Sequence, residues 1–382
     1  MNKNKIAISA EPDLFRYNRI LNSSWANKFP GASWIPLLKE KLDQDFDVVT
    51  ADVALSHVEQ GYWAVEDVVV VQHVHDNVAN CLVEMGAMPL AIMCFESPLY
   101  VGEFYDKVSE IAPCFKFRIL FSGLHDLYQA KVGINHNATF PSYFLNDLNN
   151  KIIPWNQRGF LVGVIGNKYV VSPDFPRLRT PMEWYWWLRK RVALFIYKSF
   201  SSRRFPVQKV QLQEMRLELI AFFMEKGLLD LYGKGWDILR NLPPKWQKKL
   251  PPIFAINPPL ACDNKLEKIR HYQYGLCIEN AKFSGYVTEK IIDCLVAGVI
   301  PLYMGAPDID KYIPEECFVD LRKYANWDDL QTYLQEMSEK EAMAMINCGT
   351  AFLRSEKGRC YSYEGFAEFM EDIVRTECGS FS

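Results

Sequence analysis

The sequence has no long hydrophobic run. Every stretch of 18 residues contains a charged side chain, and the opening residues, MNKNKIAISAEPD, lack the apolar core of a signal peptide. A surplus of one charge is also missing, since 43 Lys and Arg stand against 46 Asp and Glu, for a net charge of -3. Such a chain has no global attraction for nucleic acid. We therefore expect a cytoplasmic protein without a nucleic-acid partner.

Cysteine patterns typical of metal sites or disulfide frameworks are absent too. The ten cysteines are scattered, with no C-x-x-C pair and no spacing of metal ligands. We expect most of them to be reduced and buried, where they behave as small apolar residues. No metal site is predicted, and no serine lies in a nucleophile-elbow context.

What the chain does have is a regular alternation of short apolar runs with helical patterns. At 382 residues it is too long for one ordinary core. Helical spacing is present in ASWIPLLKEKL, NVANCLVEMG and EFYDKVSEIA. Short apolar strands are predicted around them at residues 5–10, 47–52, 67–74, 89–97 and 116–123. This rhythm predicts a mostly parallel, doubly wound sheet.

A polar and aromatic stretch at residues 137–154 interrupts the alternation, and a second set of elements follows. We predict a strand at 160–168, a helix at 208–226, a loop at 241–264 and a helix at 266–271. The predicted fold is α/β, with two Rossmann-like domains facing across a cleft and ligands at the strand ends. The expected parts are an acceptor-binding domain at 1–154, a donor-binding domain at 155–350 with an insertion at about 172–209, and a C-terminal helix within 351–382 that crosses back.

One segment of the second set, SGYVTEKIIDCLVAGVIPLYMG, predicts a helix that leads into a buried strand. Thr288 is placed as the N-cap, with its hydroxyl bonded to a first-turn N–H, and Gly298 as the stop. Glu289 and Lys290 lie in the first turn, where the helix dipole favours a phosphate. A carboxylate there can accept two hydrogen bonds from a vicinal diol such as ribose. The motif alone also fits a capped surface helix with one solvated ion pair.

The residues around this helix resemble the donor-binding core of the family 10 α-1,3/α-1,4-fucosyltransferases. Glu-Asn at 279–280, Tyr-Val-Thr-Glu-Lys at 286–290, Ala-Gly-Val-Ile-Pro at 297–301 and Tyr-Ile-Pro at 312–314 follow in the family's order. Ile278 departs from the pattern, because phenylalanine is usual there. Weaker resemblance, in FLVGVIGNK, QLQEMRLELIAFFMEKGLLDLYGKGWD and CFESP, covers most of the chain after residue 89. The resemblance implies a glycosyltransferase of the two-domain GT-B type that uses GDP-fucose.

The resemblance also implies roles for residues at matching positions. Asn280, Tyr286, Glu289 and Lys290 would bind the GDP-sugar, with Glu289 at the ribose and Lys290 at the phosphates. Arg216 resembles the arginine that meets the diphosphate, where a fork of donors suits an oxygen-rich leaving group. The alternative for Arg216 is a solvated helix arginine.

Two further features of the second domain are candidates for donor contacts. Lys168, in GNK at a predicted strand end, would be a second nucleotide-sugar ligand, with a purely structural lysine as the alternative. The turn YGKGWD at residues 232–237 offers glycines where backbone can approach a ligand closely.

The catalytic base is predicted in the first domain. Transfer with inversion needs one carboxylate to take the proton of the acceptor hydroxyl. Glu96, in MCFESP, follows an apolar strand and matches the family's Glu-Ser-Pro, so we interpret it as the base. The alternative is a glutamate that only caps a loop. The family does not require a metal-holding Asp-x-Asp triad, so no cofactor is expected beyond the GDP-fucose donor, although Mg²⁺ or Mn²⁺ could stimulate the reaction.

Other reactive-looking residues are weaker candidates. His73 and His75 would share one face of a strand, as metal ligands can, but no third ligand is identifiable and cleft-lining histidines are favoured. His125 and Asp126 are adjacent and can hardly face each other as a base and its orienting group. Asn137, in NAT, is a glycosylation site only in a secreted protein.

The insertion at about residues 172–209 has no counterpart in the compact family core. It carries nine Lys or Arg against two acids, and four consecutive aromatic residues stand at 184–187. A basic helix with a tryptophan-rich face can lie in a membrane interface. We expect either peripheral contact with an anionic inner leaflet, near a lipid-linked glycan, or a solvated helical pair that packs its tryptophans on the second domain.

Together these features predict an inverting fucosyltransferase that moves L-fucose from GDP-fucose to a hydroxyl of a GlcNAc- or galactose-containing glycan, in α-1,3 or α-1,4 linkage. Two alternatives stay open. The same scaffold can carry another nucleotide-linked sugar, because contacts to phosphate and ribose do not read the sugar. The chain can also be a nucleotide-sugar-binding protein without turnover, against which the intact Glu96 speaks.

Overall fold

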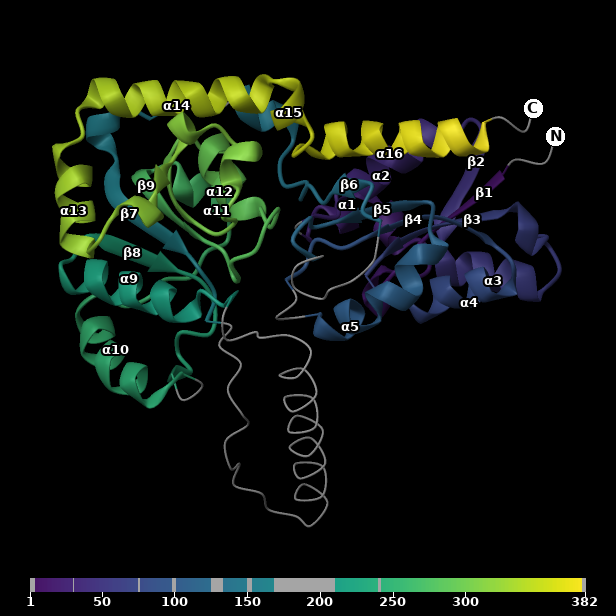
Figure 1. The fold of residues 1–382 in the computed structure, drawn as a ribbon, viewed down its shortest axis with the longest axis horizontal. Helices are drawn as coiled ribbons and strands as arrows, with labels where there is room; N and C mark the ends of the chain where they lie inside the picture. Colours follow the sequence, from purple (N-terminus) through teal and green to yellow (C-terminus); the bar gives the residue numbers. More distant parts are fainter. Residues whose placement is uncertain are drawn as a thin grey trace, which may run out of the picture.

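The structure is a computed structural model of the 382-residue chain. It describes residues 4–29, 31–74, 76–97, 101–124, 133–149, 153–167, 210–239 and 242–379, without the side chains of residues 102, 103 and 106. Figure 1 shows two α/β units side by side, joined along one edge by the helices near the C-terminus.

The first unit is built on a six-stranded sheet of order β2-β1-β3-β4-β5-β6, in which every neighbouring pair is parallel. Its strands are β1 (Asn4–Ile8), β2 (Phe46–Thr50), β3 (Val68–His73), β4 (Met88–Met93), β5 (Phe117–Leu120) and β6 (His136–Asn137). The helices of this unit are α1 (Ser23–Ala26), α2 (Trp34–Leu42), α3 (Ala51–Glu59), α4 (Asn77–Met85) and α5 (Gly102–Ile111). Central strand β3 opens with four valines that are all buried, as expected for a parallel strand covered on both faces.

The second unit contains a five-stranded parallel sheet of order β11-β10-β9-β7-β8. Its strands are β7 (Gly159–Val164), β8 (Leu229–Tyr232), β9 (Tyr272–Ile278), β10 (Ile300–Met304) and β11 (Val319–Asp320). Its helices are α9 (Gln213–Glu225), α10 (Pro244–Ile256), α11 (Lys265–Ile269), α12 (Glu289–Val296), α13 (Trp327–Glu336), α14 (Glu339–Arg354) and α15 (Glu356–Arg359). Two parallel sheets, each with its helices, confirm the predicted α/β class and its GT-B arrangement of two Rossmann-like units.

The last helix, α16 (Tyr363–Cys378), follows the second unit in sequence but packs on the first. It lies against α2, where Phe366 meets Trp34 edge to face at 5.0 Å between ring centroids. At the far end of α16, the amide of Asn4 donates a hydrogen bond to the carbonyl of Cys378 at 3.1 Å. The core of the first sheet is therefore closed by residues from both ends of the described chain (Figure 1).

The loop predicted at residues 241–264 is wrong, because most of it forms α10. Pro243 and Pro244 stand at the start of this helix, where a missing N–H costs nothing. Trp246, Leu250 and Ile253 are buried with helical spacing, and their burial holds the helix together even though Pro251 and Pro252 lie inside it. The turn-forming residues misled the prediction.

Several predicted boundaries also differ. The strand predicted at 47–52 ends at Thr50, because α3 begins at Ala51. The strand predicted at 89–97 ends at Met93. The helix predicted from residue 208 begins, in the described chain, at Gln213. Just before it, Gln211 pairs with Ala281 as an isolated antiparallel bridge, which the helical spacing could not reveal.

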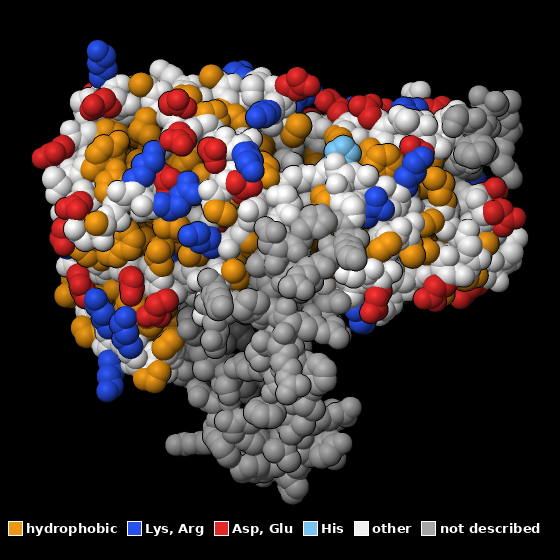
Figure 2. Space-filling model, viewed as in Figure 1, with side chains coloured by type: hydrophobic (Ala, Val, Ile, Leu, Met, Phe, Trp, Pro, Cys, Tyr) orange, Lys and Arg blue, Asp and Glu red, His pale blue; other side chains and the backbone are white. Residues whose placement is uncertain are grey.

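In the described part of the chain, none of the helices is long and apolar enough to cross a membrane. Acidic and basic side chains are interspersed on the face of the molecule seen in Figure 2. The basic aromatic insertion at 172–209 lies outside the described residues.

Candidate active site

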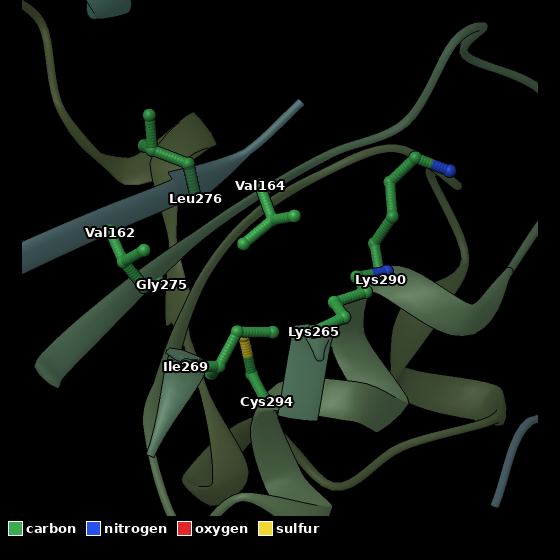
Figure 3. A pocket seen from close by; sticks show the side chains of 8 residues that line it. All are labelled: Val162, Val164, Lys265, Ile269, Gly275, Leu276, Lys290 and Cys294. Carbon is green, nitrogen blue, oxygen red and sulfur yellow. The ribbon is translucent and has the colours of Figure 1, made fainter. Parts of the chain in front are cut away.

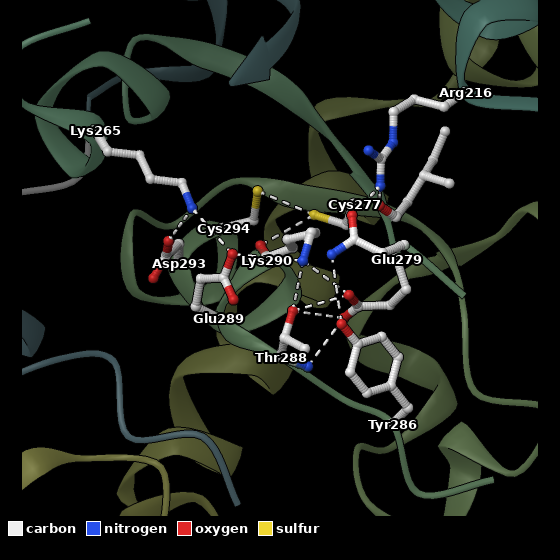
Figure 4. Close-up of polar contacts among 12 residues, drawn as sticks. Arg216, Lys265, Cys277, Glu279, Tyr286, Thr288, Glu289, Lys290, Asp293 and Cys294 are labelled. Carbon is white, nitrogen blue, oxygen red and sulfur yellow. Dashed lines mark hydrogen bonds and ion pairs between the residues drawn. The ribbon is translucent and has the colours of Figure 1, made fainter. Parts of the chain in front are cut away.

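The residues predicted to form the donor side of the site gather at the carboxyl end of β9 and the start of α12. Glu279 and Asn280 directly follow β9, and α12 begins at Glu289. The Glu279 side chain has no solvent exposure and accepts hydrogen bonds from Thr288 and Lys290 at 2.8–2.9 Å (Figure 4). A fully buried carboxylate thus ties the end of the strand to the start of the helix.

Thr288 occupies the predicted N-cap position, but the predicted capping bond is wrong. Its hydroxyl makes no bond to a first-turn N–H of α12. Instead it contacts both carboxylate oxygens of Glu279, and it lies 2.7 Å from the ammonium of Lys290. The reason is that Glu279 is fully buried, and a buried carboxylate requires hydrogen-bond donors in place of water. Gly298, with φ at 66°, ends the helix as predicted.

Glu289 and Lys290 lie in the first turn of α12, where the sequence placed them. Burial alone would raise the pKa of Glu289, but the charges of Lys290 and Lys265 outweigh it and lower the pKa to about 2. Burial alone would lower the pKa of Lys290, but Glu279 and Glu289 hold it above its ordinary value. Both groups are therefore charged at neutral pH, in a partly buried position.

A second charged pair lies one turn further along α12. Asp293 is buried and forms an ion pair with Lys265, a residue at the start of α11 (Figure 4). Burial raises the pKa of Asp293 to about 6, even though Lys265 acts in the opposite direction. Lys265 also lies 4.0 Å from Glu289, so the two pairs form one network along the helix start.

Arg216, in the first turn of α9, points to the same strand end. It is buried, and its Nη2 donates to the carbonyl of Ile278 at 2.7 Å and to Oδ1 of Asn280 at 3.0 Å. Nδ2 of Asn280 in turn lies 3.5 Å from the hydroxyl of Tyr286. The solvated helix arginine considered for Arg216 is therefore wrong. Arg216, Tyr286, Glu289 and Lys290 lie around the ends of β9 and α12 (Figure 4), and Asn280 joins them through its bonds to Arg216 and Tyr286.

The glycine turn lies beside Arg216. Gly233 has φ at 140°, and a Cβ there would be 2.2 Å from the carbonyl oxygen of Ile165, so only glycine fits. The backbone N–H of Asn167 donates to the carbonyl of Lys234 at 2.9 Å, which joins the turn to the loop after β7. Lys168, the next residue of that loop, lies outside the described residues.

A small pocket behind α12 does not enlarge the donor site. It is enclosed by Val162, Val164, Ile269, Gly275, Leu276 and Cys294, with Lys265 and Lys290 at its rim (Figure 3). Its volume is about 10 Å³, which is room for no more than one water molecule. We interpret it as a packing gap between α11, α12 and the sheet.

The segment before α12 joins the donor side to the first unit. The ring of Tyr286 stacks on Phe283 at 4.5 Å and meets Phe121, just after β5, at 5.0 Å. The amide of Asn137 donates to the carbonyl of Gly285 at 3.2 Å. Gly285 has φ at 75°, and a Cβ on it would lie 2.2 Å from Oδ1 of Asn137. The two units are thus in direct contact at the site.

Glu96 lies on the first unit, three residues after the end of β4, and is exposed. Its backbone carbonyl accepts a hydrogen bond from the hydroxyl of Tyr105 at 2.8 Å, which holds the loop. Burial raises the pKa of Tyr286 well above its ordinary value, and the charge of Glu96 is among those that raise it further. The predicted base therefore lies within electrostatic reach of the donor side.

Of the histidines considered as site residues, the structure describes His73 but not His75 or His125. His73 is the last residue of β3, and burial lowers its pKa to about 4. His75, His125 and Asp126 lie outside the described residues. Among the residues that the structure describes, no group of three or more His, Cys, Asp or Glu side chains is arranged to hold a metal ion.

Glu279 and Lys265 are functional-site residues that were not predicted from the sequence. For Glu279 a signal was present, because the motif IEN places a carboxylate directly after an apolar strand, where the site forms. For Lys265 there was no such signal, since its contact with Asp293 joins two helices that are separated in the sequence by β9.

Residues 205–345 match the family model for the C-terminal region of glycosyltransferase family 10 (fucosyltransferase). The family 10 resemblance is confirmed. An α-(1,3)-fucosyltransferase of Helicobacter pylori is 31% identical over 104 residues, which are 27% of this chain and 22% of that protein. An α-(1,4)-fucosyltransferase of Arabidopsis thaliana is 32% identical over 84 residues, or 21% of each chain. The matched segments thus span under a quarter of these relatives.

A crystal structure of an α1,3-fucosyltransferase with GDP aligns over 97% of this chain and 90% of its own, with 16% identity and a TM-score of 0.42. The family match covers Arg216, Asn280, Tyr286, Glu289 and Lys290, and it leaves Glu96 outside.

Proposed function

We propose that this protein is an inverting glycosyltransferase that moves L-fucose from GDP-fucose to a GlcNAc- or galactose-containing glycan, in α-1,3 or α-1,4 linkage. The observation that carries the proposal is the meeting of Arg216, Asn280 and the Glu279–Lys290 pair at one strand end. This strand end lies in the part of the chain that matches family 10, and it is in electrostatic reach of Glu96.

The donor binds at the start of α12. The carboxylate of Glu289, ionised at neutral pH, accepts hydrogen bonds from the ribose hydroxyls. Lys290, Arg216 and the first-turn N–H groups of α12 surround the diphosphate, whose negative charge grows as the sugar leaves. Glu279 orients Lys290 from behind, so the ammonium is in place before the donor arrives.

The acceptor binds on the first unit. Its hydroxyl oxygen attacks the anomeric carbon from the face opposite GDP and forms the new C–O bond. At the same time its proton passes to the carboxylate of Glu96, and the bond to the β-phosphate oxygen breaks. Side chains alone supply the base and the charge stabilisation in this scheme, so Mg²⁺ or Mn²⁺ would stimulate without being required.

The test is a donor screen. The full chain is heated with GDP, UDP, CMP or dTDP, and the rise in melting temperature is compared. GDP-fucose and other sugar diphosphates of the best nucleotide are then supplied with a glycan acceptor. We expect GDP alone to stabilise the chain and fucose to be transferred. Stabilisation by another nucleotide, or transfer of another sugar, would identify the alternative donor, and binding without transfer would identify a non-catalytic protein.

A single substitution, Arg216→Gln, tests whether Arg216 contributes to GDP binding. It removes the guanidinium that bonds to Ile278 and Asn280, and we expect GDP affinity to fall by roughly tenfold to a hundredfold. Arg354→Gln, which removes an exposed arginine bonded to the carbonyl of Leu148, should leave GDP affinity unchanged. If both variants bound GDP with equal affinity, Arg216 would not be a ligand of the diphosphate.

We further propose a cytoplasmic location with peripheral contact to an anionic membrane, near a lipid-linked acceptor. The support is the composition of the insertion at 172–209, which combines nine basic residues with a run of four aromatic ones. Co-sedimentation with vesicles of anionic and of neutral lipid measures the contact. Deletion of residues 181–204 should abolish binding to the anionic vesicles, and unchanged binding would exclude the insertion as the membrane anchor.

A further inference from the structure

A large cavity opens in the first unit, where β1, β3 and β4 end. Its volume is about 540 Å³, within the range of about 300–1,000 Å³ that small-molecule sites occupy. Glu96 lines it, so the proposed base belongs to the wall of this cavity. The cavity is therefore where an acceptor can be held with one hydroxyl at Glu96.

The wall of the cavity is mainly apolar, and five large aromatic side chains form part of it. Phe15 meets Phe29 edge to face at 4.8 Å, and Phe95 meets Phe140 in the same way at 5.8 Å. Trp34 completes this part of the lining. Aromatic faces of this kind pack against apolar C–H surfaces, such as those of a pyranose ring or an alkyl substituent.

The charges around the cavity disfavour an anionic ligand. Of the described residues that line it, none is lysine or arginine, whereas Glu11 and Glu96 contribute carboxylates. Arg16 lies 2.8 Å from Glu11 and compensates that charge. A negatively charged acceptor would add a further negative charge beside the two carboxylates of this lining, whereas a neutral acceptor adds none.

His73 lines the cavity, and the fold does not explain why its imidazole is buried there. Its backbone is fixed by hydrogen bonds with the hydroxyl of Ser9, and its ring lies 5.3 Å from that of Phe95. Nε2 has no hydrogen-bond partner among the described residues. Burial lowers the pKa of His73 to about 4, so the imidazole is neutral at neutral pH. A buried polar atom without a partner requires a functional or structural reason.

We propose that this cavity binds the acceptor as a neutral glycoside with an apolar face or substituent on the aromatic wall, and that the His73 imidazole hydrogen-bonds the acceptor and so sets its orientation toward Glu96. The inference rests on the proposed transfer reaction and deepens it. His73 ends β3 and Glu96 lies just beyond the end of the neighbouring parallel strand β4. The N–H of Val74 donates to the carbonyl of Met93 at 2.8 Å, which ties the two strand ends together.

The experiment separates acceptor binding from donor binding. His73→Phe keeps a flat ring against Phe95 and removes both nitrogens, whereas His73→Asn and His73→Gln place an amide near the positions of Nδ1 and Nε2. With methyl β-N-acetyllactosaminide as the acceptor, we expect His73→Phe to raise the acceptor KM by about tenfold. One of the two amide variants should restore most of the loss. The donor KM and the affinity for GDP should stay unchanged in all three.

A second comparison uses the unaltered chain. The octyl glycoside should have a lower KM than the methyl glycoside, and the sialylated methyl glycoside, which is anionic, a higher one. An acceptor KM unaffected by His73→Phe, failure of both amides to restore it, or preference for the anionic glycoside would overturn the inference. GDP binding and transfer would then still stand. Absence of GDP binding in the unaltered chain would instead overturn the proposed function, and this inference with it.

Discussion

The ammonium of Lys290 lies 2.9 Å from Oε2 of Glu279, a carboxylate with no solvent exposure. The two residues come from different elements, the end of β9 and the start of α12, so their contact fixes one against the other. Thr288 adds its hydroxyl to the same carboxylate. The first turn of α12 is thereby set before any donor is bound.

Removing the charge of Glu279 should destabilise the fold. Glu279→Gln leaves the partly buried Lys290 without its closest charged partner, and we expect a loss of about 3 kcal/mol in the free energy of unfolding. Urea denaturation measures it. Glu315→Gln is the control, because Glu315 pairs with Lys323 at 3.0 Å on the surface and its loss should cost about 0–1 kcal/mol. Similar costs for the two variants would show that burial adds nothing to the first pair.

Glu96→Gln should separate binding from chemistry. The amide keeps the size of the side chain but cannot take a proton, so we expect transfer to fall by about 100- to 10,000-fold. GDP affinity, measured by calorimetry, should stay the same because Glu96 lies on the first unit. Glu110→Gln, an exposed position on α5, serves as the control and should transfer at the normal rate. If Glu96→Gln still transferred the sugar at the normal rate, another residue would have to be the base.

Gly285 should tolerate no side chain. Its φ of 75° is left-handed, and a Cβ would lie 2.2 Å from Oδ1 of Asn137 and 2.6 Å from Oγ of Ser122. We expect Gly285→Ala to cost more than about 2 kcal/mol and to lower transfer more than GDP binding, since it pushes the two units apart.

Gly61 is the matched control for Gly285. Its φ of 73° is nearly the same, but no atom lies within 4 Å of a Cβ placed there. Gly61→Ala should therefore cost only the backbone strain, about 1 kcal/mol, in the same denaturation experiment. If both alanine variants lose the same stability, the contact between Gly285 and the first unit is not what excludes a side chain.

The pKa values of Glu289 and Asp293, one turn apart on α12, predict opposite pH dependences for their contributions to the free energy of unfolding. The pKa of Glu289 in the folded state, about 2, is below its ordinary value of 4.5, so its ionised form stabilises the fold fully above pH 4.5 and the contribution is lost as pH falls toward 2. The pKa of Asp293 is raised to about 6 from 3.8, so stability attributable to it falls as pH rises from 3.8 to 6.

Denaturation of the unaltered chain, Glu289→Gln and Asp293→Asn from pH 3 to pH 8 tests these signs. The free energy of unfolding of the unaltered chain should exceed that of Glu289→Gln at neutral pH, and this difference should shrink as the pH falls below 4.5. The difference in stability between the unaltered chain and Asp293→Asn should change in the other direction, mainly between pH 6 and pH 3.8. Parallel profiles for the two variants would contradict the assignment of burial and ion pairing to these residues.

Much of the fold could be predicted from the sequence because its signals are local. The valines of β3 and the apolar stripe of α12 mark buried elements by their spacing alone. α10 could not be recognised, since its prolines read as breakers and the tertiary contacts of Trp246 override them. The sequence shows propensity, but it does not show which neighbour will cover a segment.

In the candidate site, too, local sequence signals could be recognised and tertiary contacts could not. Glu289 and Lys290 could be placed from their motif, because a strand-to-helix junction brings them to the sheet edge by itself. The bond from Arg216 to Asn280 joins residues 64 positions apart and was not predicted. Only the resemblance to a family had assigned both residues to the same ligand. The hydroxyl of Thr288 was misassigned because nothing local shows that Glu279 is buried beside it.

The position of α16 has a consequence for how the chain is made. The first sheet, which leaves the ribosome early, buries Met370 and Val374 of α16 in its own core. Until those residues are synthesised, the nascent unit exposes the apolar surface that they will cover, including Trp34. We therefore expect the core of the first unit to be completed only after α16 has been synthesised, once the whole second unit has been translated.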